Sequence, residues 1–310
     1  MILSLFTKGN PRSAAVAEPN PRRLRLLADL ERIESYPTLS ETAVQVATLL
    51  AGSEPSIAEV SSIVRRDTVL TATILRMANT WTYRGNREVE DVQQAVLRLG
   101  LQESGRVLTA VGMRRAYSHP SPRVQERCDA LFRHGLLVAR LSAGAARHVR
   151  AVQPGVAFTA GLLHDIGRLV LAVKCPEEVD AGDPLDYAEG RDTIPREREW
   201  FGVDHCAIGY QLGLRNSLPE GVVRVVLNHH RPHDEQLQPD LVALVAAMDD
   251  VANYAHRERR ISGYRLAACP FRDEFAQAMS SAGLARFEQQ LPALVVQAVK
   301  DVRAMLKALA

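Results

Sequence analysis

Apolar residues recur every three or four positions along most of this chain, and few segments alternate apolar and polar residues with a period of two. A spacing of three or four places side chains on one face of an α-helix, whereas a period of two is typical of a half-buried strand. The first such face is formed by Leu24, Leu27, Leu30 and Ile33. Longer periodic segments cover 123–149, 156–172, 197–212, 221–230 and 241–256. The sequence therefore predicts an all-α protein, built as a bundle of many helices.

Residue types that start and end helices stand at the boundaries of several segments. Ser40, Ser56, Asp67 and Asp91 each precede an apolar-periodic segment, and short side chains with an acceptor oxygen are preferred N-caps. Gly100 stands where the helix after Asp91 should end. Glycine and proline elsewhere fall mostly in the breaks between segments, which supports the helical prediction.

The composition excludes some classes of partner. The chain has 310 residues, of which 46% are apolar and 24% charged, as in an ordinary soluble protein with one large or two small domains. The net charge of +2 gives no overall electrostatic reason to bind nucleic acid, and aromatic residues make up only 5% of the chain, too few for a base-stacking surface. Arginine pairs at 65–66 and 114–115 are typical of solvated faces. Nucleic acid is therefore not an expected partner.

The cysteines and the termini bear on location. Cys128, Cys175, Cys206 and Cys269 lie far apart with no CxxC spacing, which is typical of reduced thiols in a cytoplasmic protein. Cys206 follows His205, but adjacent helical side chains diverge, so a buried thiol is expected there and not a metal ligand. No segment is expected to be long enough to cross a membrane. The N-terminal MILSLFTKGN has no charged n-region, and its apolar stretch is too short for a signal peptide. We therefore expect a cytoplasmic location.

The stretch GLLHDIGRLVL, which begins at Gly161, places His164 and Asp165 side by side inside an apolar run. A neutral imidazole beside a carboxylate is a ready pair of metal ligands. Further residues of these types are His134, His205, His229, His230 and Asp249. Each of them alone has an ordinary explanation, as a polar helix residue, a cap or a histidine near a helix C-terminus. Their joint occurrence predicts a metal site.

Several sequence blocks resemble those of an HDOD domain, a bacterial signalling relative of the HD and HD-GYP phosphohydrolases. The order H…HD…H…HH…D is the ligand order of the binuclear branch of the HD superfamily. The other blocks are YPTLSETAVQVATLL from Tyr36, IVRRDTVLTATILRMANT from Ile63, VEDVQQAVLRLG from Val89, FRHG from Phe132, FGVDHCAIG from Phe201 and SLPEGVVRVVLNHHRP from Ser217. Thr68 and Thr80 depart from the family pattern, which has proline and serine there. The resemblance covers residues 36–255.

The resemblance implies an N-terminal helical lobe packed on an HD-like lobe. We place the HDOD domain at 24–256, with the N-terminal lobe at 24–120 and the HD-like lobe at 121–256, because SHPSPRV at 118–124 interrupts the helical pattern. Residues 1–23 lack periodicity and are expected to form a disordered tail. Residues 257–310 are expected to add amphipathic helices that pack on the body or on a partner. We expect the two lobes to form one cooperative body.

The resemblance and the ligand chemistry together predict a mono- or binuclear metal site, with Asp165 as the bridge between two ions. The first ion would be held by His134, His164 and Asp249. The second ion would be held by His205, His229 and His230. Imidazole and carboxylate ligands suit Fe, Mn, Ni, Co or Zn. Two such ions can hold a phosphodiester and activate a water molecule.

Two departures from the hydrolytic HD-GYP relatives argue against catalysis. Arg168 stands where those enzymes carry lysine, and the loop HHRPHDEQLQPD after the histidine pair lacks GYP. We expect Arg168 to contact phosphate or ligand as a fixed fork that cannot donate a proton. The HDOD family is regarded as regulatory, so we expect a stand-alone bacterial signal-transduction protein that binds a partner protein or a nucleotide. The alternative is a metal-dependent phosphohydrolase acting on a nucleotide or cyclic dinucleotide.

Overall fold

The computed structural model describes residues 45, 56–80, 82–83, 85, 87–149, 151–182, 187 and 193–309. The regular structure of these residues is helical and includes no strand, which confirms the all-α prediction. The tail predicted at 1–23, the helical face at 24–33 and the cap at Ser40 lie outside the described residues. The domain boundaries given above stay predictions.

The N-terminal part of the described chain consists of α3 (Ile57–Arg65), α4 (Thr68–Ala78), α5 (Val92–Leu99) and α6 (Leu101–Ala116). The predicted caps Ser56, Asp67 and Asp91 each accept hydrogen bonds from backbone N–H groups in the first turn of their helix. Gly100 ends α5 with a φ of 79°, a conformation that glycine adopts without strain. The helix boundaries of this lobe are therefore set by short local signals.

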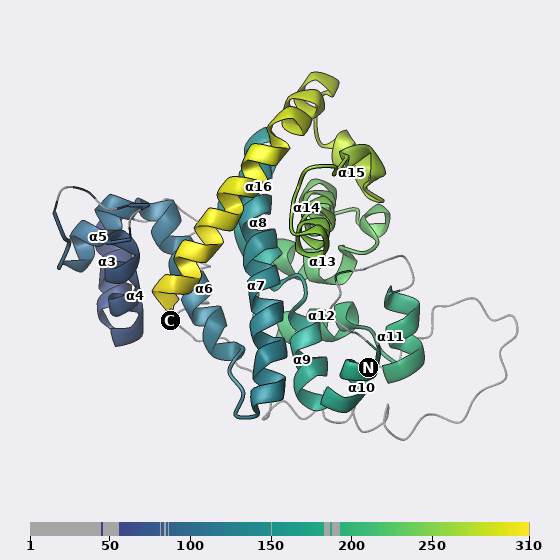
Figure 1. The fold of residues 1–310 in the computed structure, drawn as a ribbon, viewed down its shortest axis with the longest axis horizontal. Helices are drawn as coiled ribbons and strands as arrows, with labels where there is room; N and C mark the ends of the chain where they lie inside the picture. Colours follow the sequence, from purple (N-terminus) through teal and green to yellow (C-terminus); the bar gives the residue numbers. More distant parts are fainter. Residues whose placement is uncertain are drawn as a thin grey trace, which may run out of the picture.

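The HD-like lobe is built around α7 (Pro122–Ala145), the long helix near the centre of Figure 1. It continues through η3 (Ala146–His148), α8 (Pro154–Leu163), α9 (Ile166–Lys174), α10 (Pro176–Gly182), α11 (Thr193–Phe201), α12 (His205–Arg215), α13 (Glu220–Asn228), η4 (Pro232–Asp234) and α14 (Pro239–Glu258). Helix α7 packs against α8, α9 and α14. This packing gathers helices that carry the predicted ligands.

Two segments predicted as single helices are each divided in two. The segment 156–172 is broken between α8 and α9, where Asp165 leaves the helical conformation with φ −100° and ψ 18°. The segment 197–212 ends at Phe201 and starts again at His205, because Gly202 has a φ of 74° and Asp204 caps α12. The flanks of both breaks are buried, so apolar periodicity runs through them and does not reveal them.

The C-terminal region adds η5 (Leu266–Ala268), α15 (Arg272–Gln277) and the long α16 (Ser281–Leu309). Helix α16, yellow in Figure 1, crosses α7 and reaches α4. The side chain of Arg76 in α4 donates through Nε to Ala308 O at 2.9 Å. The amphipathic helices predicted for 257–310 therefore pack on the body of the protein.

The described helices of both lobes share one apolar core. An ion pair crosses it, since the buried Arg140 of α7 donates to the Glu103 carboxylate of α6 with both terminal guanidinium nitrogens. Contrary to the expectation from the sequence, Pro154–Lys174 is long and apolar enough to cross a membrane by length and composition. However, 89% of its apolar window is buried inside the fold, so its hydrophobicity is accounted for by core packing.

Candidate metal centre

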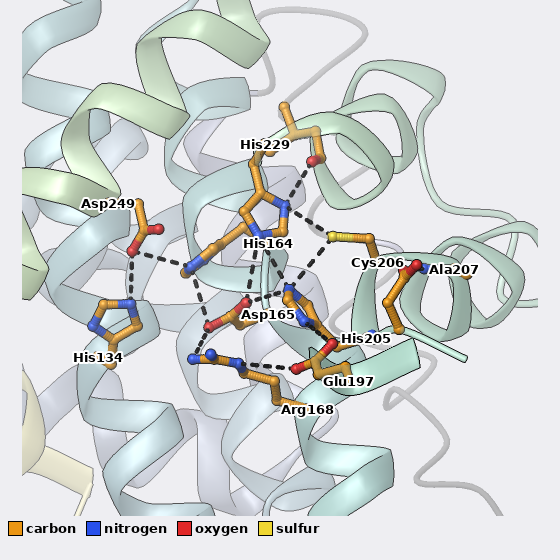
Figure 2. A network of polar contacts seen from close by, with 12 residues as sticks. His134, His164, Asp165, Arg168, Glu197, His205, Cys206, Ala207, His229 and Asp249 are labelled. Carbon is orange, nitrogen blue, oxygen red and sulfur yellow. Dashed lines mark hydrogen bonds and ion pairs between the residues drawn. The ribbon is translucent and has the colours of Figure 1, made fainter. Parts of the chain in front are cut away.

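Six of the seven predicted ligands face one another in the middle of the HD-like lobe (Figure 2). They are His134 on α7, His164 and Asp165 at the turn between α8 and α9, His205 at the start of α12, His229 at the end of α13 and Asp249 on α14. None of the six is more than 4% exposed. Helices distant in the sequence thus converge on one polar cluster inside an apolar core.

Asp165 lies between two sets of side chains. Its Oδ1 atom is 3.2 Å from His205 Nε2 and 3.5 Å from His229 Nε2. Its Oδ2 atom is 3.5 Å from His164 Nε2 and 3.2 Å from Arg168 Nη1. Burial disfavours ionisation, but Arg168 and the surrounding imidazoles outweigh it and hold the pKa of the Asp165 carboxyl well below its usual range. One oxygen of this carboxylate therefore faces His205 and His229, and the other faces His164 and Arg168.

Asp249 forms the second acidic part of the cluster. Its Oδ1 atom lies 2.9 Å from His134 Nε2 and 3.5 Å from His164 Nε2, and it accepts a hydrogen bond from Asn253 Nδ2 at 3.1 Å. Burial opposes ionisation here as well, yet His164 and His134 keep the pKa of the Asp249 carboxyl well below its usual range. His164 is thereby shared by two ionised carboxylates.

Three imidazoles have orientations fixed by their Nδ1 atoms. His164 Nδ1 and His229 Nδ1 lie 2.8 Å and 3.1 Å from backbone carbonyl oxygens of their own helices. Carbonyl oxygens only accept, so both Nδ1 atoms carry the proton. His205 Nδ1 lies 2.7 Å from the Glu197 carboxylate. All three Nε2 atoms then face Asp165, and His164 Nε2 has no hydrogen-bond partner among the described residues. Metal-binding histidines have this arrangement, with one nitrogen anchored and the other directed at the ion.

Two of these three imidazoles, His205 and His229, bind protons more strongly than an ordinary histidine does. Burial disfavours the charged form, but Cys206 and Asp165 raise the pKa of His229 to about 10. Cys206, Glu197 and Asp165 likewise raise the pKa of His205 well above its usual range despite burial. Protons on these rings balance the carboxylates, and a cation can take their place. The imidazole and carboxylate groups of this cluster therefore fit a divalent metal ion.

Cys206 is a buried thiol, as expected, but its side chain does not diverge from that of His205. Its Sγ atom lies 3.4 Å from His205 Nε2 and 4.0 Å from His229 Nδ1, because α12 packs beside α13 and both side chains enter the space between them. The half-buried His230 joins the same group: ligand atoms of His205, Cys206, His229 and His230 lie within 4.8 Å of one another. His134, His164 and Asp165 form a second group by the same criterion.

The sequence profile of the HDOD domain family matches residues 36–232, well over half of the chain. This chain belongs to the HDOD domain family. The matched range contains six of the seven predicted ligands, and only Asp249 lies beyond it. The place of Asp249 in the HDOD cluster is therefore established by its contacts with His134 and His164 and not by the family match.

Solved structures share the fold of this HDOD chain. An HDOD domain protein of unknown function from Geobacter sulfurreducens has a TM-score of 0.68 at 22% identity and covers 89% of this chain and 97% of its own. A proposed signal transduction protein from Marinobacter aquaeolei VT8 has a TM-score of 0.68 at 18% identity, over 93% of this chain and 65% of its own. A proposed metal-dependent phosphohydrolase from Shewanella amazonensis SB2B has a TM-score of 0.58 at 19% identity, over 93% and 98%. At these identities the likeness establishes the fold alone.

A curated relative gives no function. It is an uncharacterized protein of Treponema pallidum (strain Nichols), 23% identical over 240 residues. The match takes in 76% of this chain but only 45% of the length of the relative. The HDOD chain thus spans under half of the relative that it matches.

The Arg168 guanidinium, predicted to contact phosphate or ligand, is buried among carboxylates. Nη1 lies 3.2 Å from Asp165 Oδ2 and Nε lies 4.0 Å from Glu197 Oε1. Glu197 also accepts from the backbone N–H of His205 at 2.8 Å. Glu197 was not among the predicted residues, because REREWF has the composition of a solvated face. Its proximity to His205 depends on the chain reversing at Gly202. Arg168 therefore helps to orient Asp165, and Glu197 helps to orient His205.

A small pocket leads from the surface to the HDOD cluster. Its volume is about 210 Å³, and its lining includes Asp249, His230, Arg198 and Arg231. Asp249 is buried, whereas the Arg198 and Arg231 side chains are 51% and 38% exposed, so the arginines lie at the outer end. Pockets for drug-sized ligands have volumes of about 300–1,000 Å³. This pocket has room for a phosphate-sized group and not for a cyclic dinucleotide.

Proposed function

We propose that this HDOD chain is a regulatory signal-transduction protein that acts by binding a partner, and that its cluster holds a divalent transition metal as part of the domain body. The observation that carries the proposal is the convergence of three anchored imidazoles, His164, His205 and His229, on the Asp165 carboxylate. Nε2 lone pairs and carboxylate oxygens are all electron-rich, so a cation is needed among them. Protons on His205 and His229 supply this positive charge only at pH values below the raised pKa values of the two rings.

The two groups differ in the metal that they would favour. The group of His134, His164 and Asp165 with Asp249 offers nitrogen and oxygen, which suits Fe, Mn, Co or Ni. The group that contains Cys206 adds a thiolate, which shifts the preference toward Zn or Fe. A bound ion supplies a Lewis acid that can hold phosphate oxygens and lower the pKa of a coordinated water. The residues around it fix the coordination and restrict access.

Restricted access is the reason to favour regulation over hydrolysis of a cyclic dinucleotide. The cluster lies behind a pocket of about 210 Å³, and Arg168 is engaged with Asp165. Because the Arg168 guanidinium is paired with this carboxylate, it is less available to contact the phosphate group of a substrate. None of the four cysteines forms a disulfide, which supports a reducing, cytoplasmic location.

The alternative function, a metal-dependent phosphohydrolase, is supported by a different observation. Arg198 and Arg231 lie at the outer end of the pocket, and Asp249 and His230 lie deeper. Two cations in front of a metal centre suit the phosphate of a small ester. Arg198 would exchange its contact with Asp204, at 2.6 Å, for such a phosphate. The substrate in this case would be a compact phosphate ester or a nucleotide that enters phosphate first.

Metal analysis combined with an activity assay tests the proposal. The chain is purified anaerobically without an affinity metal column, as wild type, Asp249→Asn and Asp250→Asn. We expect at least one transition ion per wild-type chain, loss of metal in Asp249→Asn, and retention in Asp250→Asn, whose carboxylate instead accepts from Tyr264 Oη at 2.7 Å. A metal content near zero after addition of Mn, Fe or Zn would contradict the metal site.

Activity is measured on cyclic di-GMP and on bis(p-nitrophenyl) phosphate with the same preparations. We expect turnover far below about 1 per second, the lower end of ordinary enzyme rates. Metal-dependent turnover at or above that rate, lost in Asp165→Ala, would replace the regulatory proposal with the phosphohydrolase.

A further inference from the structure

A second cavity lies outside the metal cluster, along α16. It has a volume of about 720 Å³ and is bounded by α16, by α7 and by the C-terminal end of α14. We call it the α16 groove. Its apolar floor includes Val295, Val296, Val299, Val302 and Leu306. Val295 and Val302 are 3% and 8% exposed, whereas Val296 is 50% exposed. The groove therefore combines recessed apolar side chains with one apolar side chain at its edge.

The charge of the α16 groove is entirely positive. The basic residues that line it are Arg133, Arg259, Arg260, Lys300 and Arg303, and no aspartate or glutamate is among the lining residues. None of these five cations has an ion pair within the described part of the chain, although the whole chain has a net charge of only +2. Unpaired cations of one sign around an apolar floor attract an anionic, partly apolar partner.

We propose that the α16 groove binds an acidic amphipathic helix of a partner protein. Val295, Val299, Val302 and Leu306 follow one another at intervals of four, three and four residues, the spacing of a stripe on one helix face. Such a stripe is about 16 Å long, or about three helical turns. A partner helix with apolar residues at the same spacing packs into it, and acidic residues on its flanks meet the cations.

The same features disfavour other anionic partners. A flat lipid surface cannot reach the recessed Val295 and Val302 side chains. Single-stranded nucleic acid needs free aromatic faces for stacking, and the tyrosine that lines the groove, Tyr187, is already stacked on His256 with ring centroids 4.4 Å apart. A protein helix accounts for both the apolar stripe and the charge.

The α16 groove adjoins the metal cluster, which gives partner binding a route to it. His256 lines the groove, and its ring centroid lies 5.4 Å from that of His134. A helix seated in the groove therefore contacts a side chain packed directly against a cluster residue. This inference deepens the proposed function, because it rests on regulation through a partner and assigns the partner a site and a chemistry.

The test uses the full-length, metal-containing chain and a synthetic fluorescein-labelled peptide of about 18 residues, long enough for about five helical turns. The peptide has leucine at intervals of three and four and glutamate on both flanks. The comparison probes are a scrambled peptide, the same peptide with lysine for glutamate, a single-stranded oligonucleotide and phosphatidylglycerol vesicles. Fluorescence anisotropy is measured for the peptides and the oligonucleotide, and cosedimentation for the vesicles.

Two variants alter the groove and two serve as matched controls. Lys300→Glu combined with Arg303→Glu reverses charge on the rim, and Val296→Asp places a charge at the apolar edge. Lys307→Glu reverses one charge on α16 outside the groove, half the change of the double variant, and Leu97→Asp alters an apolar side chain that is 58% exposed on α5. All these side chains are exposed, so folding is retained and is checked by circular dichroism.

We expect the acidic amphipathic peptide to bind, and each groove variant to weaken binding about tenfold or more, because opposed charges and a buried carboxylate both disfavour the complex. Both controls should bind as wild type does. Equal binding of the scrambled peptide, equal weakening by Lys307→Glu, absence of peptide binding, or preference for the oligonucleotide or the vesicles would each overturn the proposal. A metal-loaded preparation that fails to bind the peptide overturns the groove alone, whereas enzyme-like turnover in a peptide-binding preparation overturns the regulatory function alone.

Discussion

Gly167, the glycine of the HDIG block, lies where α9 crosses α12, and its replacement by alanine gives a sharp test of the site geometry. A Cβ atom at this position would lie 1.9 Å from His205 O, 2.7 Å from His205 C and 2.9 Å from Gly209 N. Real Cβ atoms essentially never approach closer than 3.0 Å, so the two backbones must separate by about 1.1 Å. The atoms in the way belong to the backbone, and rotation of a side chain cannot relieve the contact.

The expected loss of stability follows from two opposed contributions. Overpacking of a well-packed core costs about 1–3 kcal/mol, and more where the backbone has to shift. Alanine in place of glycine in a helix returns about 1 kcal/mol. We expect Gly167→Ala to lower the free energy of unfolding by about 2 kcal/mol, the upper end of this difference, because backbone and not side-chain atoms must move. This is a change of roughly 3 °C in melting temperature for a chain of this size. Because His205 moves with its backbone, metal held beside Asp165 should also be lost.

Gly155→Ala is the matched control, since it makes the same change in another helix, α8. Its added Cβ would meet only Gln102 Oε1, at 3.5 Å, which is ordinary van der Waals contact. We expect this variant to be unchanged or more stable by up to about 1 kcal/mol. The measurements are urea unfolding and metal content. If Gly167→Ala unfolds within about 0.5 kcal/mol of wild type, the close crossing of α9 and α12 is wrong.

Three further predictions concern the cluster and the contact between the lobes. His164→Ala should remove most of the metal measured by mass spectrometry, whereas His233→Ala should not, because the His233 side chain is 64% exposed. Metal affinity should rise with pH, since the raised pKa values of His205 and His229, the latter about 10, keep both rings protonated at neutral pH and these protons must leave before metal binds. Titration against a competing chelator from about pH 6 to pH 9 checks this, and a flat profile would contradict it. Arg140→Ala leaves the buried Glu103 carboxylate with Arg106 Nη1, at 3.4 Å, as its remaining ion-pair partner among the described residues. We expect a loss of about 3 kcal/mol in urea unfolding, the lower end for a broken buried pair, and a loss below about 1 kcal/mol would show that this contact between the lobes matters little.

Local signals made much of the described helical structure predictable. Ser56, Asp67 and Asp91 act as N-caps because each side-chain oxygen needs only the N–H groups of the next turn. The ligand set could be proposed from residue type and order, because metal ligands are few in kind and their order in this chain resembles that of the binuclear branch of the HD superfamily. The boundaries within 156–172 and 197–212 could not, because the residues on both sides of each break are buried and apolar periodicity therefore runs through the breaks.

The residues that support the ligands were beyond sequence reasoning for a different reason. Glu197 reaches His205 only after the chain reverses at Gly202, so the contact is tertiary and leaves no spacing signal. Cys206 was placed by the divergence of neighbouring helical side chains, which ignores the contribution of α13 from the far side. Its proximity to His229 depends on how α12 and α13 pack. Such contacts are properties of helix packing, which the order of residues along one helix does not encode.

The arrangement of α7 favours a regulatory body over an enzyme. Within two turns of this helix, Arg133 lines the α16 groove, His134 contacts Asp249 in the cluster, and Arg140 holds Glu103 of α6. A helix in a close-packed core moves as a unit, so a displacement at one of these positions is felt at the others. The proposed metal site, the proposed docking groove and the contact with the N-terminal lobe therefore share one rigid element. A hydrolase needs a path that admits its whole substrate, and the pocket that reaches this cluster has a volume of only about 210 Å³, which supports the proposed regulatory function.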